Sequence, residues 1–103
     1  MGLPFVAEAV EELEEAADWY DNERPGLGEQ FATEIDRTVE RAAELPHSGS
    51  SVAGTDPSRD VRRFVVRRFP YLVVTAIIAR QRAVVAVAHH SRRPGYWRDR
   101  LQR

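Results

Sequence analysis

The chain has 103 residues, of which 43% are hydrophobic and 30% charged, with a formal net charge of −1. This length and composition predict one globular domain over residues 1–103 and exclude a disordered chain. The absence of cysteine excludes disulfides and thiolate chemistry. No apolar run approaches the roughly 18–20 residues that span a bilayer, and the acidic start lacks a signal-peptide pattern, so we expect a cytoplasmic protein without membrane contact.

Charge is divided unevenly along the chain. Residues 1–50 carry thirteen acidic side chains and three arginines, whereas residues 51–103 carry twelve arginines and three acidic side chains. All fifteen basic side chains are arginines, whose planar guanidinium suits phosphate and carboxylate. The split indicates a basic surface that faces an anionic partner. The alternative is that the arginines only balance acids on solvated helix faces.

Two helices are predicted in the acidic half. The first is indicated by apolar residues at three- and four-residue spacing: Val6, Val10, Leu13, Ala17 and Tyr20. Pro25 and its neighbouring glycines end this helix. A second helix is predicted from about residue 27 to 45, with the apolar stripe Phe31, Ile35, Val39 and Ala42. The short turn predicts an antiparallel hairpin, and we expect its acids, such as Glu11 and Glu15, to face solvent.

The second half predicts strands. After a loop over residues 46–60, β-branched and aromatic runs predict strands at 61–66, 71–78 and 84–90, with turns at 67–70 and 79–83. Pro94 permits a final short helix over 95–101. The fold class is therefore α+β: a helical hairpin, then an antiparallel three-stranded meander and a short C-terminal helix.

A meander places the turn after its first strand and the end of its third strand at the same end of the sheet. The residues expected to meet there, as a phosphate-binding or target-binding group, are Arg67, Arg68, His89, His90, Arg92, Arg93, Tyr96, Trp97 and Arg98. The arginines suit phosphate, and Tyr96 and Trp97 suit base stacking. Alternatively the aromatics cap the sheet and the arginines pair with acids. A second group is expected at the opposite end: Arg62, Arg63, Arg80 and Arg82.

Neither a metal ion nor a cofactor is expected. His89 and His90 are adjacent on a strand, so their side chains point to opposite faces. His47 lies in a distant loop, and no histidine pair has the spacing that places two ligands on one helix face. The chain also lacks a Gly-rich phosphate loop and a Gly-x-Ser-x-Gly turn.

Several segments together resemble a known family. They are residues 16–20 (Ala-Ala-Asp-Trp-Tyr), 24–28 (Arg-Pro-Gly-Leu-Gly), 31–36, 67–71 (Arg-Arg-Phe-Pro-Tyr) and 86–97. Over about residues 5–100 the chain resembles the RelE/ParE toxin superfamily, in its ParE-like, plasmid-stabilisation branch. The resemblance implies a leading strand, here reduced to about residues 3–5, before the helices and sheet. It also implies the toxin of a type II toxin–antitoxin system, held by a cognate antitoxin in a hetero-oligomer.

The resemblance also implies a choice of target. Messenger-RNA-cleaving members carry catalytic basic residues, often lysines, before the sheet and an arginine early in the second strand. This chain has no lysine, and Tyr71 or Leu72 stands where that arginine would fall. The ParE-like function, inhibition of DNA gyrase by binding and without chemistry, is therefore favoured. One alternative is a non-toxic antitoxin-binding member. The other is a RelE-like interferase that cuts messenger RNA, either at the ribosome or free, with the candidate catalytic residues Arg67, Arg68, His89, His90, Arg93 and Tyr96.

Overall fold

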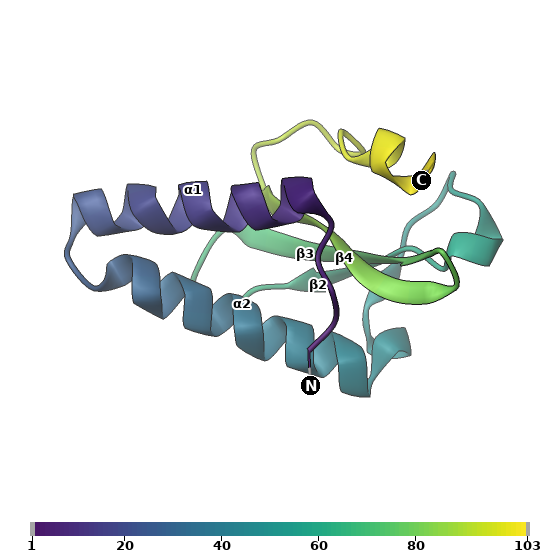
Figure 1. The fold of residues 1–103 in the computed structure, drawn as a ribbon, viewed down its shortest axis with the longest axis horizontal. Coiled ribbons are helices and arrows are strands. Elements are labelled where there is room, and N and C mark those ends of the chain that lie inside the picture. The colour runs from purple at the N-terminus through teal and green to yellow at the C-terminus, as the bar shows by residue number, and fades with distance from the viewer. Residues whose placement is uncertain (1, 103) are drawn as a thin grey trace.

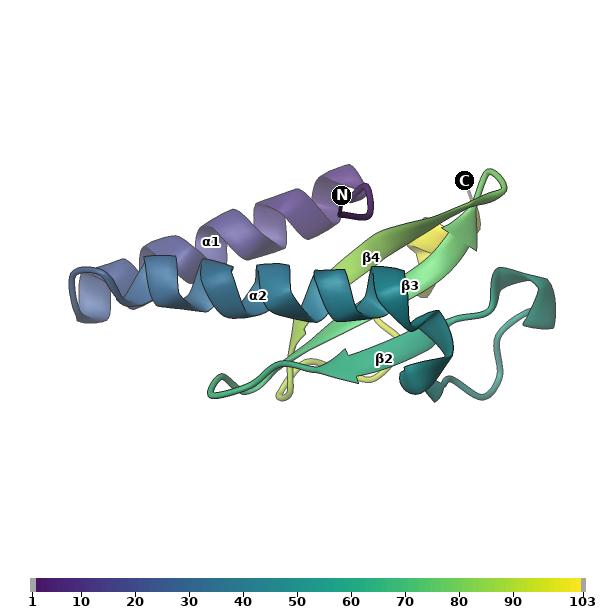
Figure 2. The same ribbon diagram turned by 90° about the horizontal axis from the view of Figure 1, so that it is seen from below.

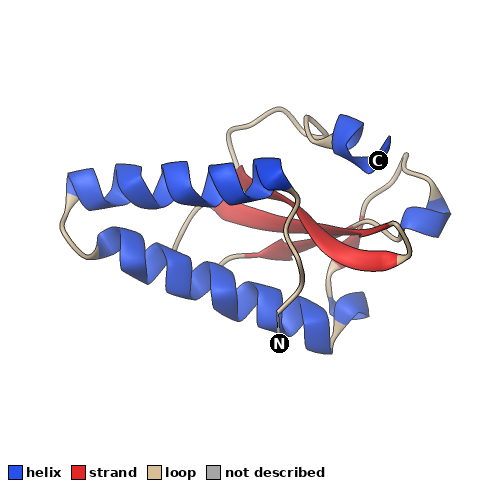
Figure 3. Ribbon diagram, viewed as in Figure 1, coloured by secondary structure: helices blue, strands red, loops and turns tan. Residues whose placement is uncertain are grey.

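The computed structural model describes residues 2–102, and within them it confirms the α+β fold (Figures 1 and 3). Two helices, α1 (Ala7–Glu23) and α2 (Leu27–Glu44), precede an antiparallel sheet with the strand order β1-β2-β3-β4. The strands are β1 (Ser50–Ser51), β2 (Arg62–Val65), β3 (Tyr71–Ile78) and β4 (Gln81–His89). Short 3-10 helices are η1 (Pro46–Ser48), η2 (Pro57–Arg59) and η3 (Arg98–Gln102). No helix in this part of the chain has the length and apolarity needed to cross a membrane.

The helical hairpin is held by a close approach of its two helices. Gly28, in the first turn of α2, is buried, and a Cβ atom there would lie 2.3 Å from the carbonyl oxygen of Ala17 in α1. Its backbone N–H donates to Asp21 Oδ1 at 2.8 Å, which satisfies one of the free donors at a helix start. A glycine is therefore required where the two helices meet.

The sheet separates two hydrophobic cores. On one face, where both helices lie (Figure 2), Phe31 and Ile35 of α2 pack in a cluster with Val73 of β3 and Val87 of β4. On the other face Trp97 and Leu101, from the chain after β4, cover a second cluster. The strand residues in that cluster are Val74, Ala76, Val85, Ala86 and Ala88, joined by Val61 just before β2. Side chains of the strands thus alternate between the two cores, except at the register shift in β4, where Val85 and Ala86 both join the second core.

Three predicted boundaries are corrected. The sheet has four strands rather than three, because Ser50 and Ser51, in the predicted loop, pair with Arg63 and Arg62. β4 begins at Gln81 rather than at residue 84. The turn before it needs only two residues, Ala79 and Arg80, with positive φ values of 50° and 68°. The short C-terminal helix is a 3-10 helix that begins at Arg98 rather than at residue 95.

The predicted leading strand is reduced to one bridge. Phe5 forms an isolated parallel bridge with Val84 of β4. Hydrogen bonds flank it, from Val6 N to the Val84 carbonyl at 3.0 Å and from Val84 N to the Pro4 carbonyl at 2.8 Å. Pro4 has no N–H to extend the ladder, and α1 begins at Ala7. These few residues still cover part of the outer edge of β4.

Candidate functional site: an arginine-rimmed groove

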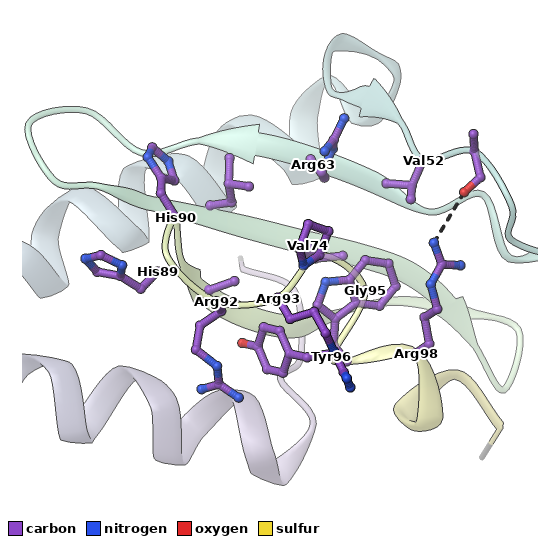
Figure 4. A pocket seen from close by; sticks show the side chains of 15 residues that line it. Val52, Arg63, Val74, His89, His90, Arg92, Arg93, Gly95, Tyr96 and Arg98 are labelled. Atoms are coloured by element: carbon purple, nitrogen blue, oxygen red, sulfur yellow. Dashed lines mark hydrogen bonds between the residues drawn. The ribbon is translucent and has the colours of Figure 1, made fainter.

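A groove of about 480 Å³ opens on the sheet face opposite the helices (Figure 4). One wall is the segment of residues 90–97, which we call the strap, as it leaves β4 and crosses back over the sheet. The floor is apolar, with Leu72, Val74 and Ala88 from the strands. The arginines and histidines that line the groove are Arg63, His89, His90, Arg92, Arg93 and Arg98. We call this feature the arginine groove.

Most of the predicted binding group does converge here. Tyr71 pairs with His89 across β3 and β4, and His90 N donates to the Pro70 carbonyl at 2.8 Å. The 67–70 turn and the strap therefore meet at one end of the sheet, as the meander predicts. The predicted residues that line the groove are His89, His90, Arg92, Arg93, Tyr96, Trp97 and Arg98.

Two arginines of the predicted group do not line the groove, and one arginine from outside that group does. Arg68 turns toward α2, where Nη2 donates to Gln30 Oε1 at 2.9 Å and Nη1 lies 3.9 Å from Glu34 Oε2. Arg67 is exposed on the same turn and outside the groove lining. Arg63, predicted at the opposite end, pairs with Val74 and shares its face of the sheet. Strand alternation was the signal for Arg63, since Val61 and Arg63 must point the same way.

The two aromatic residues of the strap are engaged within the protein. Trp97 is 4% exposed and belongs to the second core. The Tyr96 ring has the guanidinium carbon of Arg92 at 3.9 Å and that of Arg100 at 5.2 Å from its centre. Its hydroxyl donates to Glu12 Oε2 at 2.5 Å. The arrangement matches the alternative prediction, in which the aromatics cap the sheet, better than base stacking.

Glu12 of α1 is the residue that sequence reasoning missed. Its Oε1 accepts from Val87 N at 3.0 Å and from Arg100 Nη1 at 2.9 Å, and its Oε2 accepts from Arg100 Nη2 at 3.1 Å. Arg100 Nη1 also donates to the Val85 carbonyl at 2.9 Å. Its position in α1 could have revealed it. Glu12 lies three residues after Ala9 and four before Ala16, and because both alanines are buried, this spacing places Glu12 on the inner face of the helix.

Burial and Glu12 together shift the titration of both partners. Burial raises the pKa of Tyr96, and its hydrogen bond to the Glu12 carboxylate raises it further. Burial acts to lower the pKa of Arg100, but the Glu12 hydrogen bond and charge outweigh it, so that this pKa is raised. The phenol therefore stays protonated and the guanidinium charged. Both act as fixed donors that hold the strap and η3 against α1.

The group at the opposite end of the sheet centres on Asp60. Arg62 Nε lies 3.0 Å and Arg82 Nη2 2.5 Å from its carboxylate oxygens, with His47 Nε2 at 3.3 Å. Burial acts to raise the pKa of Asp60, but its hydrogen bonds with Arg62 and Arg82 outweigh it, so that the pKa is lowered. Arg62 and Arg82 lie where the meander predicts, but both are paired with Asp60, which offsets one of their two charges. Arg80 is exposed on the β3–β4 turn.

The two histidines diverge, as two successive strand residues should (Figure 4). The His89 ring packs edge-on against Tyr71, with centres 5.0 Å apart, and its Nδ1 accepts from Ser91 N at 2.9 Å. This acceptor role places the proton on Nε2. His90 is exposed on the groove rim. Across residues 2–102, no three histidine or acidic side chains are grouped closely enough to hold a metal ion.

Comparisons with known proteins identify the family. The family model described as the ParE toxin of a type II toxin–antitoxin system, parDE, matches residues 5–94. A solved structure of the chromosomal ParDE toxin–antitoxin system from P. aeruginosa has the same fold, with a TM-score of 0.69 and 17% identity. That alignment covers 86% of this chain and 95% of the other. No curated protein sequence matches the chain. Because the family model spans most of its length, the chain belongs to the ParE family of toxins of type II toxin–antitoxin systems.

Proposed function

We propose that this ParE-family toxin inhibits DNA gyrase by binding it through the arginine groove, and that a cognate antitoxin neutralises it. The observation that carries the proposal is how the polar groups around the groove are used. Tyr96 donates to Glu12, His89 Nδ1 accepts from Ser91, and Arg98 donates to the Gly54 and Ala53 carbonyls at 3.0 and 3.4 Å. Groups committed in this way favour binding over proton transfer.

Charge supports the same function. Arg63 and Arg93 are exposed on opposite walls of a groove whose floor is apolar. Guanidinium groups in this position suit carboxylates on a protein partner, and the floor suits aliphatic side chains. The same features suit an antitoxin segment that carries acidic and apolar residues. Neutralisation then follows from occupying the groove in a toxin–antitoxin hetero-oligomer in the cytoplasm.

Gyrase supercoiling tests the proposal directly. The purified protein should inhibit supercoiling, and the paired substitutions Arg63→Ala and Arg93→Ala should weaken inhibition at least tenfold, which corresponds to about 1.4 kcal/mol of binding free energy. Arg80→Ala removes one arginine from an exposed turn outside the groove and should change little, so each single variant, Arg63→Ala or Arg93→Ala, is compared with it. Supercoiling that continues unchanged at a large excess of the protein would refute the gyrase proposal.

One observation favours a second function. His90 is an exposed imidazole in the lining of the groove, which Arg93 shares, and an imidazole is suited to accept a proton from a ribose hydroxyl. Induction would then produce cuts at defined sites in transcripts, lost in His90→Ala and Arg93→Ala. Intact transcripts, together with intact gyrase activity and normal growth, would instead identify a non-toxic antitoxin-binding member.

A further inference from the structure

Trp19 is an unusual surface residue. It lies near the end of α1 and is 58% exposed. Its ring packs edge-on against Tyr20, with centres 5.1 Å apart, and Tyr20 in turn packs against Phe31 and Phe69 of the core. The exposed indole is thus supported by an aromatic side chain that is itself packed against the core. Exposed tryptophan is uncommon on a protein surface without a partner, because so much apolar area stays in water.

The surroundings of Trp19 are acidic. Glu15, Asp18 and Glu23, which lie within one helical turn of it, are all exposed, and Arg24 is the one cation nearby in sequence. This end of the hairpin, residues 15–24, extends beyond the end of the sheet in Figure 2. We call it the tip. It is a projecting, negatively charged knob with one large apolar side chain.

The arginine groove has the complementary properties. Its floor of Leu72, Val74 and Ala88 is apolar, and its volume of about 480 Å³ accommodates an indole. Two exposed arginines, Arg63 and Arg93, line the groove beside this floor, whereas Arg92 packs on Tyr96 and Arg98 donates to the Gly54 and Ala53 carbonyls. Guanidinium groups bind carboxylates and also pack on tryptophan faces. Acidic residues around an indole therefore match both parts of this groove.

We infer that the tip of one molecule docks into the arginine groove of a second copy. A tip cannot reach the groove of its own chain, because the helices cover the opposite face of the sheet. The contact is therefore head-to-tail and uses two different surfaces, so that each added molecule leaves a free tip and a free groove. The charge match between the two surfaces of one chain makes a second copy the fitting occupant. The inference does not depend on gyrase as the target.

Sedimentation velocity on the purified protein tests the inference. At about 0.01 M salt, where the Debye length is about 30 Å, the average mass should rise with protein concentration beyond that of a dimer. At about 1 M salt, where the Debye length is about 3 Å, it should return toward the monomer. Trp19→Ala and Arg93→Glu should each abolish the rise. The matched controls Leu45→Ala, at another exposed apolar residue, and Arg80→Glu should retain it.

Mixing the two variants that do not associate alone, Trp19→Ala and Arg93→Glu, gives the decisive result. Trp19→Ala keeps its groove and Arg93→Glu keeps its tip, so an equimolar mixture should form a one-to-one dimer that grows no further. A face-to-face contact between identical surfaces would not be rescued in this way. The inference is overturned if the parent protein stays monomeric at low salt and high concentration, or if the mixture remains monomeric. Growth of the mixture beyond a dimer would also overturn it.

Discussion

Glu12 connects three parts of the molecule through one carboxylate. With Arg100, it forms a pair in which both side chains are 14% exposed. We predict that Glu12→Ala lowers the free energy of unfolding by roughly 3–5 kcal/mol, because Arg100 would stay buried without its counter-charge. Tyr96 and Val87 N would also lose their acceptor. Urea denaturation measures the effect. Glu11→Ala, one residue earlier and exposed, should stay within about 0.5 kcal/mol; equal losses would contradict this role for Glu12.

Asp60 should make the stability of the protein depend on pH in the acid range. The pKa of Asp60 in the folded protein is below the ordinary value of 3.8. Its carboxylate therefore adds to the free energy of unfolding above pH 3.8, and this contribution is lost as the pH falls through the lower pKa of the folded state. Asp60→Asn should cost roughly 1.5–3 kcal/mol at neutral pH. Asparagine tolerates the φ of 42° at this position, so the backbone is not strained. The difference from the parent should shrink below about pH 4 in urea titrations. A difference that is constant with pH would show that the charge is not the cause.

At the scale of elements, the helical hairpin depends on Gly28. A methyl group there would meet the Ala17 carbonyl oxygen at 2.3 Å and the Asp21 carboxyl carbon at 2.7 Å. We predict that Gly28→Ala costs about 1–3 kcal/mol through overpacking, although alanine is the better helix former. Thermal unfolding measures the loss. Thr33→Ala, exposed on the same helix, should be neutral or slightly stabilising. A stabilised Gly28→Ala variant would show that the helices move apart easily.

Local patterns predict the elements whose signals are local. The second helix is predicted over 27–45 and observed as Leu27–Glu44, because Pro25 and Gly26 mark its start and its apolar stripe is regular. β1 has no such signal, since Ser50 and Ser51 become a strand only by pairing with β2. The turn at Ala79 and Arg80 lacks the glycine or asparagine that usually marks positive φ, so its length was overestimated.

In the candidate site too, some features follow from the sequence alone and others depend on tertiary packing. Counting strands placed the strap and the 67–70 turn at one end of the sheet, because antiparallel topology alone decides that. Which face each side chain takes requires the register, and the counting argument therefore assigned Arg63 to the wrong group. The partners of a long side chain require the tertiary packing. Arg68 reaches Gln30, 38 residues away in sequence, and Glu12 reaches Arg100, 88 residues away.

At the scale of the whole molecule, the charge split along the sequence becomes a split in space. The acidic half forms the helical layer and the arginine-rich half forms the sheet and strap (Figure 2). Several arginines are used internally, where Asp60 binds Arg62 and Arg82 and Glu12 binds Arg100. Arg63 and Arg93 remain on the groove rim. Some arginines therefore balance partly buried acids, as the alternative prediction holds, whereas Arg63 and Arg93 stay exposed for the anionic partner that we propose.

The two cores on either side of the sheet lead to a prediction about coupling. Ile35→Val, in the helix-side core, should cost about 0.5–1.5 kcal/mol, and Leu101→Ala, in the other core, about 2–5 kcal/mol. The sheet stands between these sites, so their costs should add within about 0.5 kcal/mol. Phe31→Leu combined with Ile35→Val should not add, since these residues are one helical turn apart in a single core.

Urea unfolding followed by two probes tests whether the two cores unfold together. Val73 and Val74 are successive residues of β3 and belong to different cores, so neither core can be lost while the strand keeps the other. We therefore expect one transition, with urea curves from far-ultraviolet circular dichroism and from tryptophan fluorescence coinciding. Trp97 reports on the strap side, because it is buried in that core. Loss of the Trp97 signal before the helices unfold would show instead that the strap and groove form a separate, less stable unit.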